Sequence, residues 1–137
     1  MGLTGARIFL DSCITIYLIE EHEAYAAKIE ALIASSLDAD FAISDLTVME
    51  CLVGPLRSGH RTLEDKYNRW FQDVKVFSVT RGIFTDAAKI RAEFPSLKTP
   101  DAIHLATALH YNCDEFWTND ERLSKVAPNI VRNIIRL

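Results

Sequence analysis

Short apolar runs alternate with longer helical patterns along the chain. Apolar and β-branched runs bounded by turn residues predict strands. The predicted strands are Ile8–Leu10, Phe41–Ile43, Val74–Val79, Glu115–Thr118 and Ile130–Val131. Between them, apolar positions spaced three and four residues apart predict helices. The predicted helices cover residues 14–20, 22–36, 45–53, 62–72, 81–94, 100–111 and 120–126.

The order of these elements predicts an α/β fold. Strands separated by helices form βαβ units, which place the strands in a parallel sheet with helices on both faces. We therefore expect a central, mostly parallel sheet of roughly four to five strands, within one domain that spans residues 1–137. The pairs Gly54-Pro55 and Ser58-Gly59 are expected to separate one helix from the next, and we find no internal repeat or linker.

The composition narrows the class of protein. The chain has 137 residues, with 15 Lys and Arg against 19 Asp and Glu, and its net charge of −4 argues against bulk electrostatic attraction to nucleic acid. Cys13, Cys51 and Cys113 are too scattered for a zinc site, so we expect reduced thiols that pack as small core hydrophobes. Reduced thiols indicate a cytoplasmic protein. No apolar run approaches the ~18 residues of a membrane span.

Acidic residues follow three of the predicted strands. The segments RIFLD, FAISD and FWTND end at Asp11, Asp45 and Asp120. Ligands of open parallel sheets bind outside the carboxyl ends of the strands, so these acids are expected at the ligand-binding edge. Asp is also a common N-cap where a helix follows a strand. Capping accounts for Asp45, which starts a helix beside Ser44 and Thr47, whereas Asp11 and Asp120 stay open to both interpretations.

A further acid lies on the apolar face of a predicted helix. In LKTPDAIHLATAL, Thr99 is expected to cap the helix and Pro100 to occupy its first position. Asp101 then shares a face with Leu105 and Ala108. A carboxylate is unusual on a helix face that is expected to be buried. The simple alternative is that Asp101 complements the positive end of the helix dipole.

Glu50 poses the same question on the helix predicted over residues 45–53, because it lies on the arc of Leu46 and Val53. It could extend to the surface or pair with an arginine. Four acids that converge on one pocket would destabilise the protein. Like charges ~4 Å apart repel by about 4 kcal/mol at an effective dielectric near 20. A divalent cation removes that penalty, and oxygen ligands suit Mg²⁺ or Mn²⁺. The histidines show no HExxH-like spacing, and His104 and His110 are expected on helix surfaces.

Four segments together resemble the PIN domain, and most closely the VapC-type toxin ribonucleases of bacterial and archaeal toxin–antitoxin pairs. The segments are IFLDSCITIYLIE, ISDLTVMECLVGPLR, LKTPDAIHLATAL and FWTNDERL, in this order between Ile8 and about Arg132. The resemblance implies hydrolysis of RNA that depends on Mg²⁺ or Mn²⁺. It implies that Asp11, Glu50, Asp101 and Asp120 hold the metal and are catalytic, and that Ser12, Thr47 and Thr118 support them.

The resemblance also implies protein partners, and the chain departs from the family pattern at one position. Such toxins form homodimers and bind a small antitoxin whose tail covers the active groove. The helices CITIYLIE and 62–72, with Tyr67, Trp70 and Phe71, are expected to be core or to supply those surfaces. Many family members carry Asn two positions after the first Asp, where this chain has Cys13. Arg57, Arg61, Arg91 and Lys98 are candidates for phosphate contacts or ordinary solvated residues.

Three other functions compete with the nuclease. A HAD-type phosphatase needs a second Asp two positions after the first, and Cys13 stands there. A receiver domain needs a phospho-acceptor after its third strand, where this chain has Val79 and Thr80. A non-catalytic PIN-like module that binds RNA or protein is the remaining alternative. Its signature would be the loss of an acid, and all four acids are present.

Overall fold

Five parallel strands form one sheet in the computed structural model, which describes residues 5–136. The strands are β1 (Arg7–Leu10), β2 (Asp40–Ser44), β3 (Lys75–Phe77), β4 (Glu115–Thr118) and β5 (Val131–Asn133). Their order across the sheet is β3-β2-β1-β4-β5. The chain therefore builds outward from β1 in one direction and then in the other, and β1 and β4 meet at the point of reversal. The predicted parallel sheet is confirmed.

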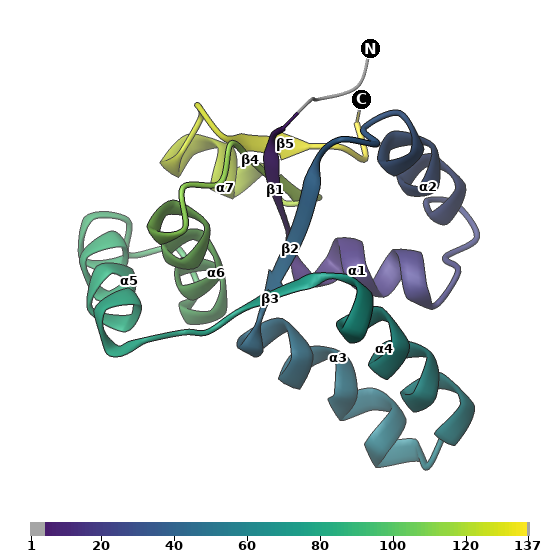
Figure 1. Cartoon of the computed structure of the whole chain (residues 1–137). Coiled ribbons are helices and arrows are strands. Elements are labelled where there is room, and N and C mark those ends of the chain that lie inside the picture. Colours follow the sequence, from purple (N-terminus) through teal and green to yellow (C-terminus); the bar gives the residue numbers. More distant parts are fainter. Residues whose placement is uncertain (1–4, 137) are drawn as a thin grey trace.

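Helices cover both faces of this sheet, as the sequence predicts (Figure 1). Helices α1 and α2 lie on one face, and α5 and α6 lie on the other. The helices are α1 (Ser12–Ile19), α2 (Ala26–Ala34), α3 (Asp45–Ser58), α4 (Arg61–Asp73), α5 (Arg81–Glu93), α6 (Thr99–His110) and α7 (Glu121–Val126). No helix in the described part of the chain is both long and apolar enough to cross a membrane.

Strand β1 shows how alternation divides the core between the two faces. Its apolar residues are fully buried, but successive side chains point to opposite sides of the sheet. Ile8 and Leu10 pack with Ile14 and Ile29 on the face of α1 and α2. Phe9 packs on the other face, with residues of α5 and α6. A strand buried on both faces reads as a continuous apolar run, which is why RIFL is recognisable.

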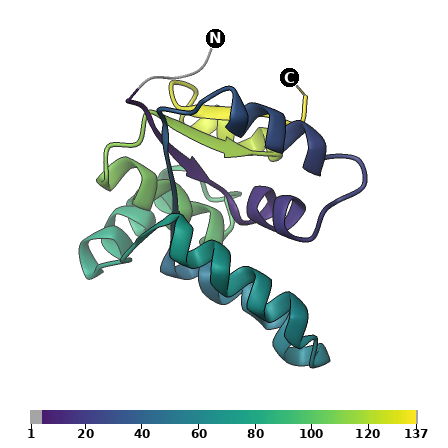
Figure 2. The same cartoon turned by 45° about the vertical axis from the view of Figure 1, so that its right-hand side comes forward.

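Helix α2 is shorter at both ends than the predicted 22–36, whereas helix α3 is longer than its prediction. The sequence pattern ends this helix at residue 53, but it continues through Pro55 to Ser58 and ends at Gly59, which has a φ of 72°. Proline removes one hydrogen bond from a helix interior, whereas the left-handed conformation of Gly59 ends the helix at little cost. The longer α3 packs against α4, and Figure 2 shows this helical pair projecting beyond the sheet.

The aromatic residues of the predicted helix 62–72 belong mainly to the core. Tyr67 is fully buried on α4 and packs with Ile19 and Cys51, while Trp70 and Phe71 are partly buried against the same cluster. The interpretation as core is therefore confirmed for Tyr67, whereas Trp70 and Phe71 lie at the margin of the core. Strand β3 is shorter than the predicted 74–79, because only residues 75–77 pair with β2.

Candidate active site

Asp11 lies directly after the central strand β1, at the carboxyl edge of the sheet where β1 and its neighbour β4 form the point of reversal. It is the N-cap of α1, and its Oδ1 accepts a hydrogen bond from the Ser12 backbone N–H at 2.8 Å. Its Oδ2 accepts a hydrogen bond from Thr118 Oγ1, at the end of β4, at 2.7 Å. Asp11 is 7% exposed. The side chain thus caps a helix and is also fixed at the point where parallel sheets bind ligands.

Asp101 reaches the same place from the first turn of α6. Leu105 and Ala108, on the face predicted to be shared with Asp101, are fully buried. Burial raises the pKa of Asp101, and the negative charges of Asp11 and Asp120 raise it further. The carboxylate of Asp101 is therefore in an electrostatically unfavourable position, which its interaction with the helix dipole alone does not explain.

The N-cap of α6 is Lys98, with no side-chain capping bond, so the prediction that Thr99 caps this helix is wrong.

Asp120 lies after β4 and caps α7, where its Oδ1 accepts a hydrogen bond from the Arg122 backbone N–H at 2.9 Å. The Arg122 side chain returns to the same carboxylate, with Nε 3.0 Å from Oδ1 and Nη2 2.7 Å from Oδ2. The same Nη2 lies 3.8 Å from Asp101 Oδ2. The hydrogen bonds from Arg122 lower the pKa of Asp120.

Glu50 approaches from α3 and is held by two side chains. Ser12 Oγ donates a hydrogen bond to Glu50 Oε1 at 2.6 Å, and His104 Nε2 lies 2.6 Å from the same oxygen. A carboxylate only accepts hydrogen bonds, so Nε2 of His104 carries a proton. Burial raises the pKa of Glu50, but the hydrogen bonds from His104 and Ser12 outweigh it, and the net pKa is lowered.

His104 is 1% exposed, so the prediction that it lies on the helix surface is wrong. The residues around it on α6 are apolar and buried, and the histidine shares their environment. Burial lowers the pKa of His104, but the hydrogen bond with Glu50 and the charge of Asp11 outweigh that effect and raise it overall. Its Nδ1 is buried and has no hydrogen-bond partner within residues 5–136. His110 is exposed, as predicted.

These side chains line one cavity of about 230 Å³. Its lining residues are Asp11, Ser12, Cys13, Glu50, Lys98, Asp101, His104, Asn119, Asp120 and Arg122. The four predicted acids thus come together from four separate parts of the chain. Thr118 lies behind Asp11, whereas Thr47 does not reach the cavity. The Thr47 hydroxyl instead accepts a hydrogen bond from Ser44 N–H at 3.4 Å and so completes the capping box of α3.

The donor set of this cavity fits a hard divalent cation. Its acids supply carboxylate oxygens, the ligands that Mg²⁺ and Mn²⁺ prefer. Burial, and after it the charges of Asp11 and Asp120, raise the pKa of Asp101, and a bound cation would offset both effects. Among residues 5–136, however, no three His, Cys, Asp or Glu side chains stand close enough together to form a finished metal site. Glu50 and Asp120 are instead directed at His104 and Arg122.

The comparison with protein families gives one match over most of the chain, a PIN domain over residues 8–128. The chain belongs to the PIN domain family. No curated protein matches it significantly. The fold is therefore that of a PIN domain, and the acids described above lie at the carboxyl edge of its sheet.

Solved structures of similar fold include toxin–antitoxin proteins. VapBC2 from Rickettsia felis, bound to a DNA fragment of its promoter, is 16% identical with a TM-score of 0.76, over 92% of this chain and 97% of that one. A toxin–antitoxin complex from Klebsiella pneumoniae is 24% identical with a TM-score of 0.75, over 93% and 97%. Mycobacterium tuberculosis VapC20, a toxin described as cleaving the sarcin–ricin loop, is 21% identical with a TM-score of 0.71, over 88% and 95%.

Cys13 distinguishes this PIN domain at its cavity. Burial and the charge of Asp11 raise the pKa of the Cys13 thiol to about 12. Cys51 and Cys113 are buried as predicted, but Cys13 is only half-buried, because it packs against the core and also lines the cavity.

Of the basic residues proposed from the sequence, some lie at the cavity and others lie elsewhere on the chain. Lys98 lines the cavity. Arg91 instead ties α5 to the start of α6, with hydrogen bonds to the Leu97 carbonyl at 2.8 Å and to Thr99 Oγ1 at 3.1 Å. Arg57 lies in the last turn of α3, and Arg61 is the first residue of α4. Arg122, which the sequence analysis missed, is the arginine that lines the cavity.

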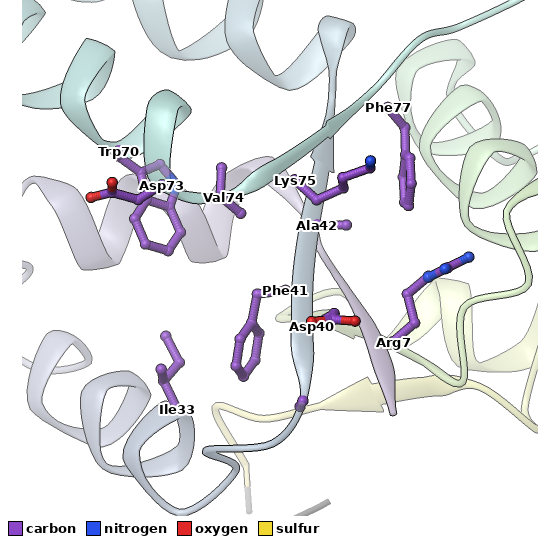
Figure 3. Close-up of a pocket in the computed structure, with 11 residues that line it drawn as sticks. Arg7, Ile33, Asp40, Phe41, Ala42, Trp70, Asp73, Val74, Lys75 and Phe77 are labelled. Carbon is purple, nitrogen blue, oxygen red and sulfur yellow. The ribbon is translucent and has the colours of Figure 1, made fainter. Parts of the chain in front are cut away.

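A larger cavity, of about 610 Å³, lies away from the acids of this PIN domain (Figure 3). It surrounds the first half of β2 and the start of β3, where Phe41 and Trp70 face it. Its charged side chains are of both signs, Arg7 and Lys75 with Asp40 and Asp73. It lacks the convergence of like charges that marks the smaller cavity, so size does not identify the candidate active site.

Proposed function

We propose that this PIN domain is a divalent-metal-dependent endoribonuclease, the cytoplasmic toxin of a toxin–antitoxin pair, which hydrolyses RNA phosphodiester bonds. The observation that carries the proposal is the convergence of Asp11, Glu50, Asp101 and Asp120 on one cavity at the reversal point of the sheet. A fold like that of a toxin described as cleaving the sarcin–ricin loop supports RNA as the substrate class.

The four acids are the proposed ligands of Mg²⁺, with Mn²⁺ as an alternative, directly or through water. A bound ion of this kind supplies an activated water and stabilises the charge of the reacting phosphate. Thr118 and Ser12 fix the orientation of Asp11, because they donate to its two different oxygens. Ser12 and His104 restrain Glu50 through its Oε1. Such hydrogen bonds behind metal ligands affect metal affinity and activity.

The negative net charge makes local basic groups necessary for RNA binding. The acids repel phosphate until a cation occupies the cavity. Lys98 and Arg122 line the cavity and are the proposed local cations for the RNA backbone. This arrangement predicts that RNA binds productively only when metal is present.

A cognate antitoxin and a second copy of the chain are the proposed protein partners. The similar structures from Rickettsia felis and Klebsiella pneumoniae are toxin–antitoxin complexes, which supports the antitoxin. Exposed apolar side chains support the homodimer: Met49 is 54% and Leu56 60% exposed on α3, and Phe84 is 52% exposed on α5. Isolated apolar side chains are ordinary, but the exposed side chains of Met49, Val53 and Leu56 follow one another on α3 at helical spacing. Leu56→Glu should convert a dimer to a monomer in light scattering.

The test is cleavage of a panel of folded RNAs by antitoxin-free protein, with Mg²⁺, Mn²⁺ or EDTA. Asp101→Asn, purified in parallel, controls for contaminating ribonuclease. Cuts that need metal and vanish in the variant support the proposal. Equal cutting by both proteins indicates contamination. Absence of both cutting and metal binding would favour a non-catalytic PIN-like module that binds RNA or protein.

A further inference from the structure

Arg122 contacts two of the proposed metal ligands, and binding of the RNA backbone alone does not explain this position. Its guanidinium binds Asp120 through two hydrogen bonds, of 3.0 Å from Nε and 2.7 Å from Nη2. Nη2 is also 3.8 Å from Asp101 Oδ2. One cationic group therefore spans two acids that come from different elements, the β4–α7 connection and the first turn of α6.

The two acids that Arg122 contacts are also two of the four proposed metal ligands. A guanidinium in a two-bond pair uses lone pairs on both oxygens of the carboxylate. Asp120 Oδ1 accepts bonds from both the backbone N–H and Nε of Arg122, so a metal ion at this carboxylate competes with the guanidinium for lone pairs, and it also repels the positive charge of the arginine. The side chain of Arg122 and the metal are therefore alternatives at Asp120.

The surroundings of Arg122 allow it to leave. Its side chain is 51% exposed, so no packed core holds it in place. The start of α7 does not depend on the guanidinium, because the backbone N–H of Arg122 makes its own 2.9 Å bond to Asp120. A guanidinium released at the mouth of this cavity is well suited to a phosphate, whose oxygens match its planar fork.

We propose that Arg122 is a built-in counter-ion that occupies Asp120 and Asp101 in the metal-free protein. Metal binding displaces it, and the displaced guanidinium binds a phosphate of the RNA. This inference rests on the proposed function, because it takes these acids as metal ligands. It assigns Arg122 two opposed effects: the residue weakens metal binding and strengthens the binding of substrate.

The experiment measures both effects with Arg122→Gln. Mn²⁺ affinity is measured by calorimetry on metal-free protein in the absence of RNA. We expect the variant to bind Mn²⁺ about fivefold more tightly, the upper value for loss of an exposed ion pair. With Mn²⁺ in excess, the KM for a cleaved RNA should rise about tenfold, as expected for a lost hydrogen bond between charged groups.

Lys125→Gln is the matched control, because it removes the same charge from an exposed position on the same helix. It should leave both quantities near those of the parent protein. Unfolding temperatures of all variants show whether the fold is intact. A merely structural role for Arg122 would not tighten metal binding.

The possible outcomes distinguish failure of the counter-ion role of Arg122 from failure of the proposed metal-dependent function. If Arg122→Gln binds Mn²⁺ no more tightly than Lys125→Gln, while Asp101→Asn abolishes binding, the counter-ion role is wrong and the metal site stands. An unchanged KM would overturn the phosphate contact. If the parent protein does not bind Mn²⁺, the proposed function fails, and this inference fails with it.

Discussion

Replacement of His104 by leucine should destabilise the metal-free protein by about 2 kcal/mol near pH 6. A net hydrogen bond to a charged group is worth ~1.5–3 kcal/mol. His104 is almost fully buried, but the Glu50 side chain is 27% exposed. Water can therefore partly solvate Glu50 when its partner is removed, which places the expected loss in the lower half of this range.

The pH dependence of this loss follows from the pKa values of the pair. The folded-state pKa of His104 is raised above its ordinary 6.5, so its contribution is complete below 6.5 and is lost as the pH rises through the folded-state value. The pKa of Glu50 is lowered below 4.5, so its contribution is present above 4.5 and is lost as the pH falls through the folded-state value. The His104–Glu50 pair therefore stabilises the folded protein most between pH 4.5 and pH 6.5.

Urea unfolding in EDTA, near pH 6 and again near pH 9, measures this difference between parent and variant. The loss caused by His104→Leu should be smaller at the higher pH. His110→Leu, at the exposed end of the same helix, should change the free energy of unfolding by less than about 0.5 kcal/mol. A loss that grows with pH, or one that does not change with it, would refute the assignment of a charged His104–Glu50 pair.

Three further predictions concern the same cavity. Millimolar Mg²⁺ or Mn²⁺ should raise the unfolding temperature of the parent protein by mass action, and Asp101→Asn should lose most of this response; equal responses would exclude a shared site. Thr118→Val should cost about 1–2 kcal/mol in urea unfolding and weaken Mn²⁺ binding, because the hydroxyl donates to Asp11 at 2.7 Å; unchanged Mn²⁺ affinity would contradict this role. The Cys13 thiol, with its pKa raised to about 12, should react with iodoacetamide near pH 8 at least tenfold more slowly than the unfolded chain, as followed by mass spectrometry. Rapid alkylation of the folded protein would contradict this assignment.

The sequence predicts the sheet and the positions of the acids because both depend on short-range patterns. RIFLD combines a buried strand with the acid that follows it, and the same holds for FWTND. Parallel pairing then brings Asp11 and Asp120 to one edge without further information. The helical period places Asp101 beside Leu105 and Ala108, and the structure buries both apolar residues.

The contacts among these side chains depend on the tertiary fold, so the sequence pattern does not contain them. Glu50 and His104 are 54 positions apart and meet only because α3 and α6 converge at the cavity. One signal was available: the other residues from Ala102 to Ala108 on α6 are apolar or small, and a histidine among them shares their burial. The role of Arg122 was harder to predict. Its side chain bonds the carboxylate of Asp120 only because of its conformation in the fold, which the sequence does not specify.

The location of bound Mn²⁺ tests most directly whether the four acids form one metal site. Crystals grown with Mn²⁺ would give an anomalous difference map that identifies the ion without reference to any assumed ligand. We expect a peak in the cavity bordered by Asp11, Glu50, Asp101 and Asp120, with the Arg122 side chain turned away from Asp120. A cavity without a peak at saturating Mn²⁺, or an ion bound elsewhere on the chain, would contradict this expectation.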